Sequence, residues 1–294
     1  MTKSVAAALG VEAVVLAAVC LVALDIRAHK RVESLGGVNM WGYRGAVLHQ
    51  KHPNELRIAV VGGDLAFGWG VAADETLASY LRRLAMLDLD RARGTKRLVT
   101  AVNLGAQGLA SAEYASWVEH FAYLRPDVIC IVPDPIGRPL REGRFLPDRH
   151  SIVFAAFGYS PILPLVLLER GTLSHSAVIG AAGRFLARAD LRVPSEPPPA
   201  DTRQSIRSAV ETAARVAPMG VVVVMPPDAD ASTREAIVPD ARVKIIELGE
   251  VTALRGDDLR LDHFHFSAGG HSRTADAVAP AVLQLVHAAE PAIR

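Results

Sequence analysis

Two short segments, far apart in the chain, combine acidic or basic side chains with a position suited to catalysis. The segment Gly62–Leu65 (GGDL) directly follows the apolar run Ile58–Val61, where an α/β enzyme places its nucleophile. Asp262 and His265 form an Asp-x-x-His pair just before a C-terminal helical pattern. In such a pair the aspartate orients a histidine that acts as general base. The segments together predict one site, with Asp64 at the nucleophile position.

Strands and helices alternate along the chain, which predicts how these segments are positioned. Apolar runs of strand length occur at Arg57–Val61, Leu98–Asn103, Val128–Val132, Val221–Met225 and Val243–Leu248. Helical spacing of apolar residues occurs at Asp74–Leu84, Ser111–Leu124, Ser205–Val216 and Gly270–Ala289. Strands that are apolar throughout indicate a parallel sheet covered on both faces. The functional loops of such a sheet follow the carboxyl ends of the strands, where both segments fall.

The N-terminal segment is long and apolar enough to span a membrane. Val5–Ile26 carries two charged residues, Glu12 and Asp25, and at about 1.5 Å per residue it crosses a hydrocarbon core of about 30 Å. No small-residue cleavage site follows it, which favours an uncleaved signal anchor. Basic residues after the helix favour a cytoplasmic domain, whereas a short N-terminal tail before a large domain favours export. We expect a single-pass anchor at residues 1–30, with the domain on the extracytoplasmic, periplasmic side.

Two features predict other membrane-protein subunits as partners. A charged Glu12 would cost about 2.5–3.5 kcal/mol at mid-membrane, so it lies near the interface, is protonated, or meets a polar group on a partner helix. Ile152–Leu168 is strongly apolar, but Gly158, Pro161 and Pro164 make it a poor transmembrane helix. It could be a lid over the site, a membrane-facing surface, a subunit contact or a segment packed onto the core.

Composition narrows the function classes further. Half of the 294 residues are hydrophobic, enough for one large domain, and 32 Lys+Arg balance 31 Asp+Glu. No basic stripe indicates a nucleic-acid partner. The two cysteines, Cys20 and Cys130, have no Cys/His spacing typical of zinc sites.

Three segments resemble the sequence blocks of SGNH (GDSL-type) hydrolases. Gly62–Leu65 is similar to the Gly-Asp-Ser-Leu block, Asn103–Gly108 to the second block, and Asp262–His271 to the last block. The stretch Asn39–Gly45 also fits, and it is common in membrane-anchored members of the family. The resemblance covers about 38–289.

The resemblance implies a three-layer, flavodoxin-like α/β fold with a parallel sheet of about five strands. It places the SGNH-like domain at 57–294, after a juxtamembrane segment at 31–56. An insertion at about 138–200 separates the third and fourth strands.

The resemblance also implies roles for single residues. In the family, a serine attacks an acyl ester, a histidine takes the proton, and an aspartate orients the histidine. A backbone amide, a second-block glycine and a third-block asparagine hold the oxyanion. Asp262 and His265 match the acid and the base, and Gly108 matches the glycine. Asp64 stands in the serine position, and Ile136 stands at the asparagine position.

These two departures predict a catalytically degenerate member of the family, a pseudoenzyme. Losing one oxyanion donor costs about 2.7–4 kcal/mol, and losing the serine removes the covalent route. An ionised Asp64 would pair with His265 and repel a developing oxyanion. We therefore expect an accessory, structural or ligand-binding subunit of a membrane assembly, with an acyl or glycan ligand.

An enzymatic alternative remains. The chain could be an acyl-ester hydrolase or O-acyltransferase of envelope glycans or lipids, with Asp64 as an altered nucleophile or acid/base group. A metal could bind Asp64, Asp134, Asp262 and His265, but the spacing does not demand one, so no metal or cofactor is predicted. His263 and His271 are expected at the surface or as caps.

Overall fold

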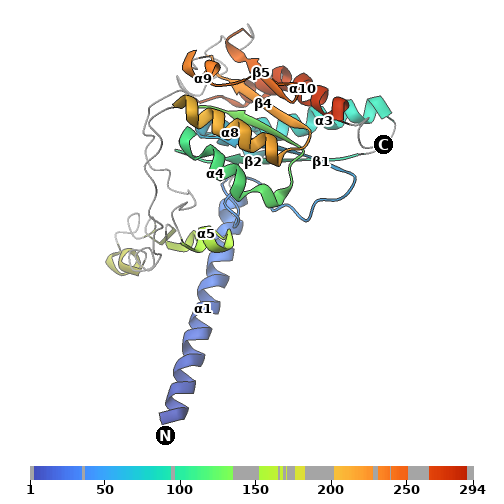
Figure 1. Cartoon of the computed structure of the whole chain (residues 1–294). Helices are drawn as coiled ribbons and strands as arrows, with labels where there is room; N and C mark the ends of the chain where they lie inside the picture. The colour runs from blue at the N-terminus through green and yellow to red at the C-terminus, as the bar shows by residue number, and fades with distance from the viewer. Residues whose placement is uncertain are drawn as a thin grey trace. The chain divides into compact units, whose positions relative to one another are not determined.

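The computed structural model divides the chain into two compact units (Figure 1). One comprises Met1–Gly42 with Pro147–Ser195, and the other comprises Tyr43–Leu146 with Glu196–Arg294. The structure describes residues 3–34, 37–93, 97–134, 152–164, 166–167, 170, 176–182, 202–227, 231–238, 240–250 and 265–289. The predicted domain boundaries stay predictions.

The second unit, called the α/β unit below, is built on a five-stranded parallel sheet. Its strands are β1 (Glu55–Gly62), β2 (Leu98–Gly105), β3 (Val128–Val132), β4 (Gly220–Met225) and β5 (Val243–Glu247). They are ordered β2-β1-β3-β4-β5, and every neighbouring pair is parallel. This is the flavodoxin-like order, in which the chain changes direction across the sheet between β1 and β3. The predicted α/β fold with about five parallel strands is confirmed.

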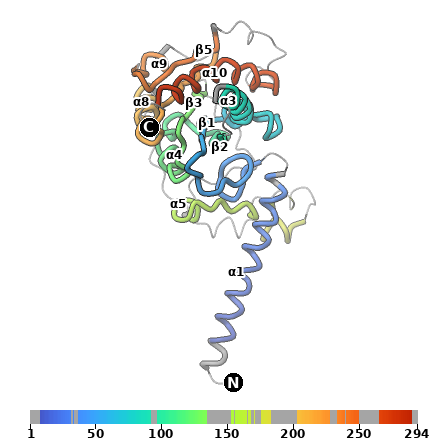
Figure 2. The backbone as a smooth tube through the Cα atoms, turned by 90° about the vertical axis from the view of Figure 1, so that its right-hand side faces the viewer, coloured from blue at the N-terminus to red at the C-terminus, as the bar shows by residue number. Residues whose placement is uncertain are grey.

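Helices cover both faces of the sheet, as the apolar strands predicted. Among the described residues of this unit, the four longest are α3 (Leu77–Arg93), α4 (Tyr114–His120), α8 (Thr202–Val216) and α10 (Ala268–Ala289). α3 contacts α10 on one face, and α4 contacts α8 on the other (Figure 2). Between them, β1 is buried at every residue.

Helix boundaries differ from the predicted ones where short 3-10 turns intervene. A 3-10 turn at Ala73–Glu75 precedes α3, so that helix begins later than predicted and ends at Arg93. The predicted helix over Ser111–Leu124 is divided into a 3-10 turn, α4 and a second 3-10 turn. Arg125 ends that run with a left-handed φ of 54°.

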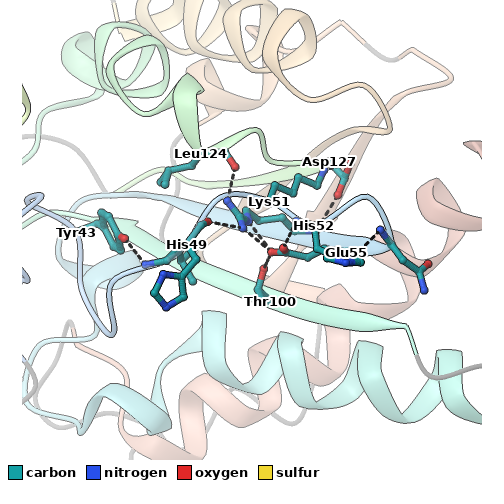
Figure 3. Close-up of polar contacts among 11 residues, drawn as sticks. Tyr43, His49, Lys51, His52, Glu55, Thr100, Leu124 and Asp127 are labelled. Carbon is teal, nitrogen blue, oxygen red and sulfur yellow. Dashed lines mark hydrogen bonds and ion pairs between the residues drawn. The ribbon is translucent and has the colours of Figure 1, made fainter.

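A buried ionic network lies at the amino ends of the strands (Figure 3). The guanidinium of Arg57 donates to Oε1 of Glu55 and to the carbonyl of Leu124, each over 2.7 Å. The carboxylate of Asp127 accepts from Nζ of Lys51 over 2.5 Å and from the backbone N–H of Arg57 over 2.7 Å. The network connects the segment before β1 to the amino ends of the strands, at the opposite end of the sheet from the functional loops.

The first unit contains α1 (Lys3–Ser34) and α5 (Ile152–Phe157). In the described part of the chain, α1 is the one helix long and apolar enough to cross a membrane, over Ala8–Arg31 with a mean hydropathy of 2.4. α5 ends at Gly158, which has a left-handed φ of 68°. The apolar segment Ile152–Leu168 is therefore interrupted at Gly158, as the sequence predicted.

Candidate functional site

The turn after β1 places Asp64 at the first position of α2 (Asp64–Phe67). Two glycines make this turn possible because other chain segments approach it closely. A Cβ on Gly62 would lie 2.3 Å from the carbonyl oxygen of Val132, at the end of β3. A Cβ on Gly63 would lie 1.7 Å from Oδ2 of Asp134. The glycines of the GGDL segment thus make room for β3 and for the residue that follows it.

Asp134 reaches from the loop after β3 to the start of α2. Its Oδ2 accepts the backbone N–H of Asp64 over 2.9 Å, and its Oδ1 accepts that of Leu65 over 3.2 Å. The backbone N–H of Asp134 itself donates to the hydroxyl of the fully buried Tyr114 over 3.3 Å. A side-chain carboxylate therefore satisfies two of the N–H groups that open this helical turn.

The carboxylate of Asp64 is buried among the same elements. It accepts a hydrogen bond from the backbone N–H of Gly108 and is attracted by His265. Burial raises the pKa of Asp64, and these two interactions only partly offset that rise. Its Oδ2 is buried with no hydrogen-bond partner in the part of the chain that the structure describes. The structure thus brings together three of the four predicted site residues, Asp64, Gly108 and His265.

The two carboxylates influence each other's protonation. Burial, and then the negative charge of Asp64, raise the pKa of Asp134 to about 7. The pair therefore retains a proton in mildly acidic solution, where an isolated aspartate would be ionised.

His265 lies beside a tryptophan at the rim of the site. The rings of His265 and Trp69 have centroids 6.4 Å apart, and Trp69 is 49% exposed. Asp262, the predicted orienting acid, and Ile136, the predicted asparagine position, lie outside the described residues, as does His263.

Arg44 holds the loop that carries Trp69. Its guanidinium donates to the carbonyls of Phe67 over 2.6 Å, of Gly68 over 2.5 Å, and of Val71. It also lies 4.6 Å from the centre of the Phe67 ring. Burial lowers the pKa of Arg44 to about 10.

His271 also lies beside this loop, which corrects the expectation of a surface or capping position. It is 1% exposed, and a Cβ on Gly68 would lie 3.2 Å from its Nε2. Burial, and then the charge of Arg44, lower the pKa of His271 to about 3. The ring is therefore neutral at physiological pH and fills the space behind the loop.

The arrangement of donors decides what chemistry the site can do. The backbone amides of residue 64 and Gly108 are the donors that the family resemblance assigns to an oxyanion. Here the first donates to Asp134 and the second to Asp64. A tetrahedral oxyanion at this position would find these donors occupied and would lie next to carboxylates that repel it whenever they are ionised.

Sequence reasoning did not anticipate Asp134 as the partner of the α2 backbone. One signal was available: Asp134 closely follows β3, as Asp64 follows β1, and neighbouring parallel strands bring their carboxyl ends together. Among the described residues, no group of three or more His, Cys, Asp or Glu side chains is placed to hold a metal ion.

No protein-family model and no curated protein matches the chain. Solved structures do. The α/β hydrolase LAE5 from the Lake Arreo metagenome is 12% identical, with a TM-score of 0.43 over 78% of this chain and 96% of that one. The psychrotrophic esterase EstA from Pseudoalteromonas is 11% identical, with a TM-score of 0.43 over 79% and 98%.

A protein of the G-D-S-L family from Desulfitobacterium hafniense is 10% identical, with a TM-score of 0.39 over 76% of this chain and 98% of that one. This last structure is described by the name of the family that the sequence blocks resemble. All three TM-scores are below 0.5, so the chemistry of this chain is inferred from its own residues.

Proposed function

We propose that this chain is a membrane-anchored, SGNH-hydrolase-like protein that no longer hydrolyses esters. In this proposal α1 is a single-pass anchor, and the α/β unit lies on the extracytoplasmic side. The protein serves a membrane assembly as an accessory, structural or ligand-binding subunit. An acyl or glycan group is the ligand class that the ancestry of the site favours.

One observation carries the proposal. The carboxylate of Asp134 accepts the backbone N–H of Asp64, the donor that would stabilise an oxyanion. Removing a single such donor slows acyl transfer by about 10²–10³-fold. Here the donor is occupied, a carboxylate replaces the nucleophilic hydroxyl, and that carboxylate binds the second donor, Gly108.

Ester hydrolysis by the purified full-length chain tests the proposal. We expect wild type and His265→Ala to hydrolyse p-nitrophenyl acetate at the same background rate. Asp64→Ser should stay near background, because Asp134 still occupies the amide of residue 64. The double variant Asp64→Ser with Asp134→Ala frees that amide, and we expect roughly tenfold or more above Asp64→Ser.

Two results would overturn the proposal. Wild-type hydrolysis that His265→Ala abolishes would identify a working esterase or O-acyltransferase with an altered nucleophile. The second test extracts the protein gently with detergent from its native membrane. If it then elutes as a single chain without other subunits, the proposed subunit role is wrong.

A further inference from the structure

One acidic residue of α1 is buried, although nearly all of the apolar stretch is exposed. Asp25 is only 5% exposed, whereas only 6% of the most apolar stretch of α1 is buried. Its Oδ1 accepts the backbone N–H of Ile162 over 2.9 Å and that of Leu163 over 2.5 Å. Its Oδ2 accepts the hydroxyl of Tyr159. Three uncharged donors from the insertion thus satisfy both oxygens of a carboxylate on a membrane-type helix.

A second residue on the same face of α1 holds the same segment. His29 follows Asp25 by one turn, and its Nε2 lies 2.5 Å from the carbonyl oxygen of Ser160 and 3.5 Å from Oδ2 of Asp25. The ring of His29 meets the Tyr159 ring edge-on at 6.0 Å. Asp25 and His29 together form a clasp, so Tyr159–Leu163 is fixed at one level along α1.

The clasp holds α5 beside α1 (Figures 1 and 2). α5 directly precedes the clasped residues and reads Ile-Val-Phe-Ala-Ala-Phe, without a polar side chain. Phe154 is buried, but Phe157 is 75% exposed. Transfer of the exposed Phe157 ring from water into an apolar environment would be favourable.

The position of the clasp along α1 identifies that environment. The apolar stretch begins at Ala8, and Asp25 lies about 25 Å further along the helix. A hydrocarbon core is about 30 Å thick, so Asp25 lies near its far edge when α1 spans it. The exposed cations Arg27 and Lys30 follow at the level of the headgroups.

We propose that α5 and the clasped residues Tyr159–Leu163 form a membrane-interface element, which the Asp25–His29 clasp seats at the lipid boundary with Phe157 among the acyl chains. The inference rests on the proposed membrane span of α1. Apolar side chains held at the interface enter the outer part of the acyl region, as those of interfacial helices do.

Spin-label accessibility in liposomes of phosphatidylcholine and phosphatidylglycerol tests the proposal on the full chain. The native Cys20 is exposed on α1 and reports on the span itself. Phe157→Cys, in a Cys20→Ala background, reports on the proposed element. Val238→Cys, in the same background, is the matched control, because Val238 is an exposed apolar side chain (67%) of the α/β unit. Cys130 is fully buried and its thiol pKa is raised to about 12, so it should not be labelled.

We expect labels at positions 20 and 157 to collide with oxygen more often than with a water-soluble nickel chelate, and the label at 238 to show the reverse. A label at 157 that favours the chelate while Cys20 favours oxygen would overturn the interface element and leave the anchor standing. A label at 157 that neither reagent reaches would show that a protein partner covers Phe157, which also overturns the proposal. A Cys20 label that favours the chelate would overturn the anchor itself.

The clasp is tested by substitution in the Phe157→Cys chain. Asp25→Ala removes the acceptor of three hydrogen bonds, and we expect the preference for oxygen at 157 to be lost. Tyr159→Phe removes one of the three, and we expect a partial loss. Glu12→Ala removes the other acid of the apolar stretch without touching the clasp, and it should leave the label unchanged. An unchanged label in Asp25→Ala would show that the clasp does not seat the element.

Discussion

Asp64 and Asp134 show how two carboxylates can occupy the backbone donors of a turn. Each carboxylate accepts a backbone N–H that an acyl-transfer site would need, so the donors are satisfied internally. Gly63 is what permits Asp134 to enter, since any Cβ there would collide with its carboxylate. The glycine that lets this chain turn after β1 thus also lets Asp134 reach the amide of residue 64.

The raised pKa of Asp134 predicts an unusual pH dependence of stability. Its folded-state pKa of about 7 exceeds the unfolded value of 3.8, so the folded chain binds more protons between these limits. The contribution of Asp134 to the free energy of unfolding is therefore largest at low pH and falls as pH rises from about 4 to 7. Asp134→Asn should remove this dependence. The free energy of unfolding of wild type minus that of the variant should therefore fall as pH rises, by at most about 1.4 kcal/mol per pH unit.

Urea unfolding in detergent across this pH range measures the difference. Asp240→Asn is the matched control, because Asp240 accepts one backbone N–H, that of Arg242, over 3.1 Å at an exposed turn. A wild type that gains stability over Asp134→Asn as pH rises would show that the ionised carboxylate is the stabilising form, contrary to the prediction.

The sequence could predict which residues share the site but not how they bond. The family resemblance assigned Asp64 and Gly108 to one site, and in the structure the backbone N–H of Gly108 donates to the carboxylate of Asp64. The positions of Asp64 and Asp134 after neighbouring strands indicated that the two residues lie close, but not that Asp134 enters the space beside Gly63 and accepts the amide of residue 64. His271 was misjudged because its burial depends on Arg44 and Gly68, which lie far from it in sequence.

At the scale of elements, the loop from Phe67 to Val71 depends on a residue outside the sheet. Arg44 precedes β1 in sequence, and its backbone N–H donates to the carbonyl of Asn103 in β2 over 3.0 Å. Asn103 in turn donates its side-chain amide to the carbonyl of Phe67 over 3.1 Å. Periodicity predicted the strands because apolar runs report on burial. It could not predict this loop, whose conformation is fixed by hydrogen bonds to carbonyl oxygens.

Arg44→Met should loosen the loop and destabilise the α/β unit. The substitution leaves the carbonyls of Phe67, Gly68 and Val71 without their charged donor, and we expect a loss of roughly 3 kcal/mol in the free energy of unfolding. Hydrogen exchange at the amides of the loop should be faster than in wild type. Arg83→Met is the control, because Arg83 contacts only a ring, that of Tyr80, in the described contacts and should lose less than about 1 kcal/mol. Unchanged exchange in the loop would mean that Asn103 and the backbone hold it without Arg44.

At the scale of the α/β unit, the two ends of the sheet have different tasks. The carboxyl ends of β1 and β3 carry the Asp64–Asp134 pair. Their amino ends carry the network of Figure 3, in which Asp127 connects several strands. Its backbone carbonyl accepts the N–H of Met219, just before β4, and its N–H donates to Arg57 in β1. The family resemblance implied the order of the strands, but this network was not predictable, because the apolar pattern began the first strand at Arg57 and left Glu55 outside it.

Glu55→Gln should therefore destabilise the whole α/β unit, and by more at neutral pH than in acid. Burial alone would raise the pKa of Glu55, but hydrogen bonds from Thr100, the backbone of His52 and Arg57 lower it below 4.5 overall. A lowered folded-state pKa stabilises the fold above the unfolded value, and this contribution is lost as pH falls through the folded value. The variant leaves Arg57 buried without a full negative charge beside it, at a cost of about 3–5 kcal/mol near pH 7.

Urea unfolding at neutral pH and at acidic pH should show this cost shrinking in acid, because the stabilisation by the ionised Glu55 is lost as pH falls below 4.5, the pKa in the unfolded chain, toward the lower pKa in the folded chain. Glu247→Gln is the control, since its ion pair with Arg234 is solvent-exposed and should contribute less than about 1 kcal/mol at either pH. The stabilisation by Glu55 increases with pH, whereas that by Asp134 decreases with pH. Together the two residues should place the maximum stability of the α/β unit in mildly acidic solution. A cost for Glu55→Gln that stayed constant with pH would show that its carboxylate charge does not hold the network together.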